Sequence, residues 1–371
     1  MSRFTAAKAF DHASTERTGV LLVQLGTPDE PCTSAVRRYL REFLSDPRVV
    51  EIPRPLWWLI LNLFILPRRP AQSARKYASI WTAQGSPLLG HTKQLTTLLR
   101  GYLGHQGHEL SVAFAMRYGN PSVPSVMRAM REQRVTRLLV LPLYPQYAGS
   151  TTGSVYDAVF AELTRWREQP ALRMVRGFHD HPGYIDALAK RVRASWGNEG
   201  PPDVLLMSFH GIPRRSLTAG DPYHCECHAT ARLLAERLQL PDERWRISFQ
   251  SRFGRAEWLQ PYTDKTLAEL ARAGARRVDV VCPGFVSDCL ETLEEIAIEG
   301  KAVFMAAGGS DFRFIDCLND SHDLVAALTD LVTAQLGGWP TAKASAPGAD
   351  EPARARLAAR QARARALGAD R

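Results

Sequence analysis

The sequence lacks a hydrophobic run long enough to cross a membrane. Its longest apolar run covers only residues 56–66, whereas a helix that spans a bilayer needs about 20 residues. Residues 1–20 also lack the continuous apolar stretch of a secretory signal. We therefore expect a cytoplasmic protein.

Cysteine is scarce, and common nucleotide and hydrolase motifs are missing. The six cysteines are scattered, at positions 32, 225, 227, 282, 289 and 317, unlike the disulfide framework of a secreted protein. The small-residue loops at 26–31, 85–87 and 147–154 match neither the P-loop nor the dinucleotide-binding fingerprint, and no G-x-S-x-G elbow is present. We expect reduced thiols, and we expect neither a nucleotide site nor a serine hydrolase.

Positive charge is concentrated in the C-terminal tail. The formal net charge is +9, but residues 340–371 hold seven basic residues against three acidic ones, a surplus of +4. The rest of the sequence has no basic run interleaved with aromatic residues, so we expect no nucleic-acid partner. The tail is rich in alanine, arginine and proline and poor in large apolar residues, so residues 338–371 are predicted to be disordered or only loosely helical.

Strand-like and helix-like segments alternate along the rest of the chain. Apolar runs typical of strands occur at 19–25, 110–116, 136–143, 203–209, 246–250 and 276–282. Segments with helical periodicity lie between them, at 33–44, 88–103, 122–133, 153–168, 181–196, 225–238, 262–273, 289–299 and 321–336. This alternation predicts an α/β protein with parallel sheets flanked by helices.

The two halves of the sequence also resemble each other. GVLLVQLGTP near the N-terminus is similar to DVLLMSFHGIP, and VTRLLVLPLYP is similar to ARRVDVVCPGF. We predict two similar Rossmann-like domains, 19–185 and 186–337, with the active-site cleft between them. An N-terminal extension, residues 1–18, precedes them.

Candidate catalytic groups follow two of the predicted strands. His210 comes directly after the apolar run 203–209 and before Gly211. Ligands of open α/β sheets bind at the carboxyl ends of the strands, where an imidazole can act as a general base. A lone histidine is as readily a hydrogen-bonded interface residue, but its position after a strand favours a role in chemistry.

Three acidic residues follow the last predicted strand. Asp288, Glu291 and Glu295 would share one face of a helix that begins near residue 287. Helix capping accounts for Asp288 and Glu291, because acidic residues stabilise a first turn. Capping does not account for Glu295, and a row of carboxylates can also bind a divalent cation or relay protons. The spacing leaves both interpretations open.

Two further segments invite a functional interpretation. HCECH (224–228) suggests a metal site, but Cys225 and Cys227 are two residues apart and do not face each other on a helix, so we expect no zinc site. The run 56–66 begins with two tryptophans beyond Leu56 and is followed by Arg68 and Arg69. It is consistent with a buried core helix or with a pocket rim that contacts a membrane surface.

Nine motifs in the same order resemble the ferrochelatase family, from about residue 19 to about residue 332. They are QLGTP (24–28), LPRRP (66–70), KYASIWTAQGSPL (76–88), MRYGNPS (116–122), LPLYPQYAGSTTGS (141–154), SFHGIP (208–213), GDPYHCECHAT (220–230), FQSRFGRAEWLQPYT (249–263) and CPGFVSDCLETLEEI (282–296). The resemblance implies two chelatase-type domains around a porphyrin cleft. It also implies insertion of Fe²⁺ into protoporphyrin IX to form protohaem, the last step of haem biosynthesis, with release of two protons.

The resemblance also assigns roles to residues. It implies that His210 is the proton acceptor or a metal ligand, that Glu291 is its acidic partner and a second ligand, and that Asp288 and Glu295 continue the acidic path. Positions that match porphyrin-binding residues are Leu25, Arg69, Tyr77, Ser86 and Trp258. The run 56–66 matches the apolar lip of the cleft, so we expect peripheral contact with the inner membrane.

The sequence departs from the animal members of the family at the cysteines. It has Gly149 where they have a cluster-binding cysteine, and no cysteine follows Cys317. We therefore expect no [2Fe–2S] cluster and no permanently bound cofactor, with Fe²⁺ as a substrate. Cys289 replaces a histidine of the animal members.

Three alternative functions stay open. They are a chelatase for coproporphyrin III, sirohydrochlorin or cobalt, a porphyrin carrier without catalysis, and a periplasmic-type binding protein, which the missing signal opposes.

Overall fold

The computed structural model contains two four-stranded parallel sheets, and it describes residues 4–5, 12, 15–252, 254, 256–341 and 351–369. The first sheet has the order β2-β1-β3-β4 and the second β6-β5-β7-β8, with all neighbours parallel. The strands are β1 Arg17–Thr27, β2 Ser111–Gly119, β3 Val135–Pro142, β4 Ala171–Met174, β5 Val204–His210, β6 Trp245–Gln250, β7 Arg277–Val281 and β8 Asp311–Ile315. The two sheets have equivalent strand orders, which confirms the predicted fold class and the likeness of the two halves.

The central strands of both sheets are buried on both faces. In β1 Val20, Leu21, Leu22 and Val23 are fully buried, which explains why this strand is a continuous apolar run rather than an alternating one. The edge strands β4 and β8 were missed by the sequence prediction. Both are short and only partly buried, so they lack a long apolar run.

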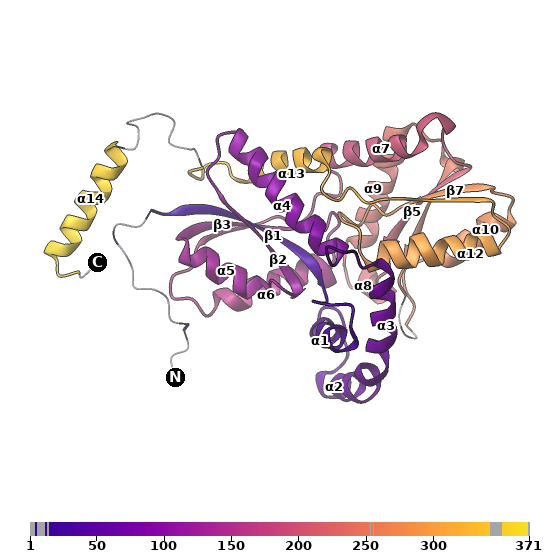
Figure 1. The fold of residues 1–371 in the computed structure, drawn as a ribbon, viewed down its shortest axis with the longest axis horizontal. Helices are drawn as coiled ribbons and strands as arrows, with labels where there is room; N and C mark the ends of the chain where they lie inside the picture. Colours follow the sequence, from indigo (N-terminus) through magenta and orange to yellow (C-terminus); the bar gives the residue numbers. More distant parts are fainter. Residues whose placement is uncertain are drawn as a thin grey trace.

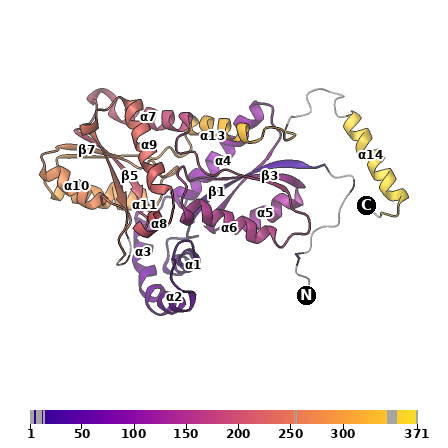
Figure 2. The same ribbon diagram turned by 180° about the vertical axis from the view of Figure 1, so that it is seen from behind.

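Helices cover the sheets, as Figures 1 and 2 show from opposite sides. Their bounds are α1 Thr33–Leu44, α2 Arg54–Ile60, α3 Leu66–Ile80, α4 Pro87–His105, α5 Val123–Glu132, α6 Ser154–Leu163, α7 Pro182–Trp196, α8 Arg214–Thr218, α9 Tyr223–Leu238, α10 Thr263–Arg272, α11 Leu290–Thr292, α12 Lys301–Ala306, α13 His322–Gln335 and α14 Glu351–Ala366. Helix α3 was not predicted because it contains Pro67 and Pro70, which normally end a helix. With α2 and the π-helical turn η1, Leu61–Ile65, it forms one helical stretch.

The two halves share one hydrophobic core. Helix α13 packs against α4 of the first half as well as against α7, and the three helices lie together along one side of the molecule in both views (Figures 1 and 2). Buried residues of the same core come from β1, α4, β5 and α13. The predicted boundary after residue 185 falls inside α7, which packs on α9, so we propose a boundary before Pro182.

Part of the tail is helical. Residues 338–371 were predicted to be disordered or only loosely helical, and Glu351–Ala366 form helix α14, because alanine and arginine are strong helix formers. Residues 342–350 of this segment lie outside the described residues, as does most of the extension 1–18. Among the described helices, none is both long and apolar enough to cross a bilayer.

Candidate active site

His210 is the last residue of β5, at the carboxyl edge of the second sheet. Its Nδ1 lies 2.6 Å from the carbonyl oxygen of Gly211. A carbonyl only accepts, so Nδ1 carries the hydrogen, and in the neutral ring Nε2 has the lone pair. The rings of Trp258 and Phe285 lie beside the imidazole, at centroid distances of 6.5 and 6.4 Å. Nε2 is therefore the atom available as a base or a metal ligand.

Glu291 faces aromatic residues of the first half. It belongs to α11, and its carboxylate acts electrostatically on Tyr39, Tyr77 and Tyr144. Burial raises the pKa of all three phenols well above the usual value, and the negative charge of Glu291 adds to this shift. The rings of Tyr39 and Tyr77 meet edge to face at 6.3 Å. The two halves therefore meet around the Glu291 carboxylate.

Glu295 is held next to both His210 and Glu291. Its Oε1 accepts a hydrogen bond of 2.7 Å from the backbone N–H of Ser251, and Oε2 accepts one from the Ser251 hydroxyl. Burial raises the pKa of Glu295, and the negative charge of Glu291 raises it further. The hydrogen bonds from Ser251 and a positive charge on His210 act in the opposite direction and lower this pKa. A half-buried carboxylate with a raised pKa is suited to accept a proton from a neighbouring base.

Asp288 has a different environment. Its Oδ1 accepts hydrogen bonds from the Thr292 hydroxyl at 3.0 Å and from the backbone N–H of Cys317 at 3.3 Å. Its Oδ2 accepts one of 2.7 Å from the side chain of Asn319. The buried carboxylate thus ties the start of α11 to the loop after β8. It does not cap the helix as the Asp288–Glu291 spacing suggested, because the N-cap residue is Cys289 and its capping-box partner is Thr292. We regard Asp288 as a positioning residue.

The acidic segment is not the α-helix that the sequence predicts over 289–299. After α11 the chain forms a π-helix, η5, over Leu293–Gly300. π-Helical turns are rare in proteins, but those that do occur are often found at functional sites. On this helix Glu294 is mostly buried and accepts a hydrogen bond of 2.9 Å from Lys76 of α3, which also pairs with Glu299 at 2.8 Å. These ion pairs connect the two halves beside the site.

Gln250 was missed by the sequence prediction. It is buried at the end of β6, its Oε1 accepts a hydrogen bond of 2.7 Å from Ser208, and its Nε2 donates one of 2.7 Å to the carbonyl of Glu291. The Ser208 hydroxyl is also hydrogen-bonded to the Thr263 hydroxyl, which donates a hydrogen bond to Ser248. These side chains form a buried network. The network fixes the backbone of Glu291 against the strands. Its sequence signal was the presence of buried polar residues in the apolar strand RISFQ.

We expect Gln250→Leu to lower the free energy of unfolding by about 1–3 kcal/mol, because the carbonyl of Glu291 loses its donor. Urea unfolding followed by circular dichroism measures the change. Gln84→Leu is the matched control, since Gln84 is exposed and its replacement should change stability by less than about 0.5 kcal/mol. Equal effects of the two substitutions would contradict the positioning role of Gln250.

The structure brings together some of the predicted porphyrin-binding residues. Leu25 and Tyr77 pack in one cluster with Tyr39 of α1, and Trp258 lies beside His210. Ser86 is buried immediately before α4. Arg69 lies on α3, where burial lowers the pKa of its guanidinium; it and Ser86 are not members of the cluster around Tyr77.

The apolar run 56–66 divides into two faces. Trp57, Leu61 and Leu66 are buried in a local core, and the indole of Trp57 donates a hydrogen bond of 2.6 Å to the carbonyl of Leu44. The opposite face is apolar but 46–61% exposed, and it consists of Leu56, Trp58, Leu59, Leu63 and Phe64. A cluster of large apolar residues at this exposure is unusual for a surface in water.

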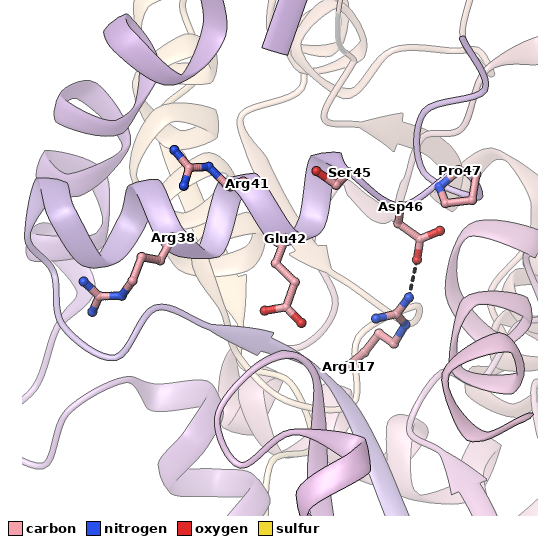
Figure 3. A pocket seen from close by; sticks show the side chains of 7 residues that line it. All are labelled: Arg38, Arg41, Glu42, Ser45, Asp46, Pro47 and Arg117. Carbon is pink, nitrogen blue, oxygen red and sulfur yellow. Dashed lines mark hydrogen bonds and ion pairs between the residues drawn. The ribbon is translucent and has the colours of Figure 1, made fainter. Parts of the chain in front are cut away.

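A separate hollow of about 470 Å³ lies along α1 (Figure 3). Its lining residues are Arg38, Arg41, Glu42, Ser45, Asp46, Pro47 and Arg117. Asp46 pairs with Arg117 at 2.5 Å, and Glu42 accepts a hydrogen bond from the backbone of Gly119 at 2.9 Å. None of the predicted site residues lines this hollow, so it is not the site described above.

The fold is that of the chelatases. The sirohydrochlorin chelatase SirB of Bacillus subtilis subspecies spizizenii, solved in complex with cobalt, superposes with a TM-score of 0.50 at 10% identity, covering 88% of this chain and 99% of that one. SirB from Bacillus subtilis with Fe³⁺ gives a TM-score of 0.51 at 13% identity, covering 88% and 100%. At these identities the likeness establishes the fold alone.

Sequence comparison narrows the class. The family model named Ferrochelatase matches residues 17–336. The chain is 58% identical to the ferrochelatase of Aromatoleum aromaticum over 100% of both proteins. It is 57% identical to that of a Janthinobacterium species over 91% of this chain and 92% of that one. The chain belongs to the ferrochelatase family.

Proposed function

We propose that the protein inserts Fe²⁺ into protoporphyrin IX to form protohaem with release of two protons, the last step of haem biosynthesis. Membership of the ferrochelatase family supports the reaction. The observation that carries the assignment of residues is that His210, from β5, and Glu291, from the segment after β7, both act on Glu295. Glu291 also acts on tyrosines of the first half.

The reaction requires a proton acceptor inside the cleft. The porphyrin carries two N–H protons in the ring that the metal enters, so both N–H bonds must break as four Fe–N bonds form. We assign the first acceptor to Nε2 of His210 and the onward path to the carboxylates of Glu291 and Glu295. The iron stays ferrous throughout, and no electron is transferred. Imidazole and carboxylate are also suitable transient ligands for Fe²⁺ before insertion.

Apolar and aromatic side chains would line the cleft and contact the macrocycle. We propose that Leu25, Tyr77 and Trp258 contact its faces, and that Arg69 and Ser86 bind its carboxylates. Binding energy at these walls favours a bent ring, and bending exposes the pyrrole nitrogens to the metal in the transition state.

The substrate is tested by anaerobic haem formation from Fe²⁺ with protoporphyrin IX and coproporphyrin III in parallel. We expect the higher kcat/KM with protoporphyrin IX. A preference for coproporphyrin III would reassign the substrate while keeping the chelatase chemistry. Tight porphyrin binding without turnover of either substrate would contradict the proposal and indicate a carrier.

We propose that the exposed apolar face of 56–66 contacts the inner membrane. Arg54 and Arg68 flank this face on α2 and α3, and basic residues beside an exposed apolar helix favour an anionic lipid surface. An apolar substrate would reach the cleft from the same side.

Phe64→Glu should weaken binding to anionic vesicles by at least about tenfold, because removing one large apolar side chain from lipid loses about 1.5–3 kcal/mol. Vesicle co-sedimentation measures the bound fraction. Phe160→Glu is the matched control, since Phe160 is also an exposed phenylalanine but lies on α6. Loss of binding in both variants, or in neither, would contradict a contact through 56–66.

We also propose that the protein carries no iron–sulfur cluster. The backbone N–H of Gly149 donates a hydrogen bond of 2.7 Å to Asp221. A side chain at this position would approach the carboxylate of Asp221 to 3.3 Å, so the loop has little room for a cysteine ligand. We propose that Fe²⁺ is a substrate of this protein and not a resident cofactor.

A further inference from the structure

Two histidines outside the cleft form a pair at the start of α9. His224 and His228 are four residues apart on one helix, a spacing that puts both side chains on the same face. Their ring centroids are 4.4 Å apart, with the planes inclined by 46°. His228 is exposed and His224 is half-buried. Among the described residues, neither ring has a protein hydrogen-bond partner.

The spacing of the rings matches a shared metal ion. A late transition metal binds an imidazole nitrogen at about 2.1 Å, which puts the ring centroid about 3.2 Å from the ion. Two such rings at an angle of about 90–109° would have centroids about 4.5–5.2 Å apart. The observed 4.4 Å needs only a small adjustment.

The surroundings hold one ring in place. The ring of His224 stacks on the buried Phe249 of β6, at a centroid distance of 5.7 Å and an angle of 19°. This contact restricts rotation of the His224 ring before a metal binds. Among the described residues no third histidine, cysteine or carboxylate joins the pair, so the protein offers two ligands.

We propose that His224 and His228 bind one divalent late transition-metal ion at a surface site separate from the cleft. Imidazole nitrogen donors select Fe²⁺, Co²⁺, Ni²⁺, Cu²⁺ or Zn²⁺ over Mg²⁺ and Ca²⁺. With few protein ligands the remaining positions belong to water, so the ion exchanges readily. The site lies one strand away from His210, since β6 pairs with β5.

Calorimetric titration of Ni²⁺ into the full-length His210→Ala variant tests the proposal, because that background removes the cleft histidine. We expect one binding site that Mg²⁺ does not compete for, and weakening by at least about tenfold on adding His228→Gln or His224→Gln. His105→Gln is the matched control, since His105 is an exposed histidine of α4 and its loss should leave the affinity unchanged.

Three outcomes would overturn the proposal. They are the absence of Ni²⁺ binding in the His210→Ala background, equal binding with and without His228, and equal weakening by His105→Gln. Circular dichroism of each variant confirms that the fold is retained. Because the measurement follows binding and not haem formation, its result is independent of the activity proposed above.

Discussion

Replacing His210 by alanine should lower kcat for haem formation by about 10²–10⁴-fold, the range that a positioned general base contributes. Nε2 of His210 is the proposed first proton acceptor, and a positive charge on the imidazole acts on Glu295. The porphyrin walls do not depend on the imidazole, so binding of protoporphyrin IX should change much less than kcat. Anaerobic haem formation and quenching of porphyrin fluorescence measure the two quantities.

The control for this substitution is His105→Ala. His105 is exposed on α4, and its loss should leave both kcat and porphyrin affinity unchanged. If His210→Ala raised KM and left kcat unchanged, the imidazole would be a binding residue and not a proton acceptor.

Gly26→Ala should lower the free energy of unfolding by at least about 3 kcal/mol, a value that only severe strain or core disruption reaches. Gly26 has φ = +113°, and a Cβ on it would lie 1.8 Å from the carbonyl oxygen of Tyr118 in the neighbouring strand. Strands β1 and β2 would have to separate at their carboxyl ends. Tyr39, which donates a hydrogen bond of 3.3 Å to the carbonyl of Gly26, would shift with them. Chemical denaturation measures the loss.

Gly274→Ala separates backbone strain from the clash. Gly274 has φ = +94°, and no atom lies within 4 Å of an added Cβ. The free energy of unfolding of this variant should therefore fall by only about 1–2 kcal/mol, the cost of a left-handed backbone conformation for a residue with a Cβ. Similar losses in the two variants would show that the close approach of β1 and β2 contributes little.

The sequence predicted the parts of the fold that rest on local patterns. The buried strands β1, β3, β5 and β7 and the helix Thr33–Leu44 were identified because burial on both faces, or on one helical face, leaves a clear apolar pattern. The edge strand β8 was not predicted, because Asp311 and Arg313 interrupt its apolar residues. The extent of α3 escaped because Pro67 and Pro70 are tolerated in the packed structure but are typical of helix ends.

The candidate site was predicted in part. Strand-end position identified His210, and the spacing of the acids, with the family resemblance, identified Glu291 and Glu295. The π-helical form of Leu293–Gly300 could not be predicted, because an α-helix also places these acids on one side. Tyr39 and Gln250 depend on contacts between distant segments, and no local pattern separates them from ordinary core and strand residues.

The central claim is that His210 and Glu291 act as one proton-accepting unit, and a double-substitution cycle on kcat tests it most directly. Residues that act as a unit are strongly non-additive. With His210→Ala, Glu291→Gln and the double variant, we expect the double variant to be no more than about tenfold slower than the slower single variant. If the two rate losses instead multiplied in full, the residues would act independently, and the shared proton path would be contradicted.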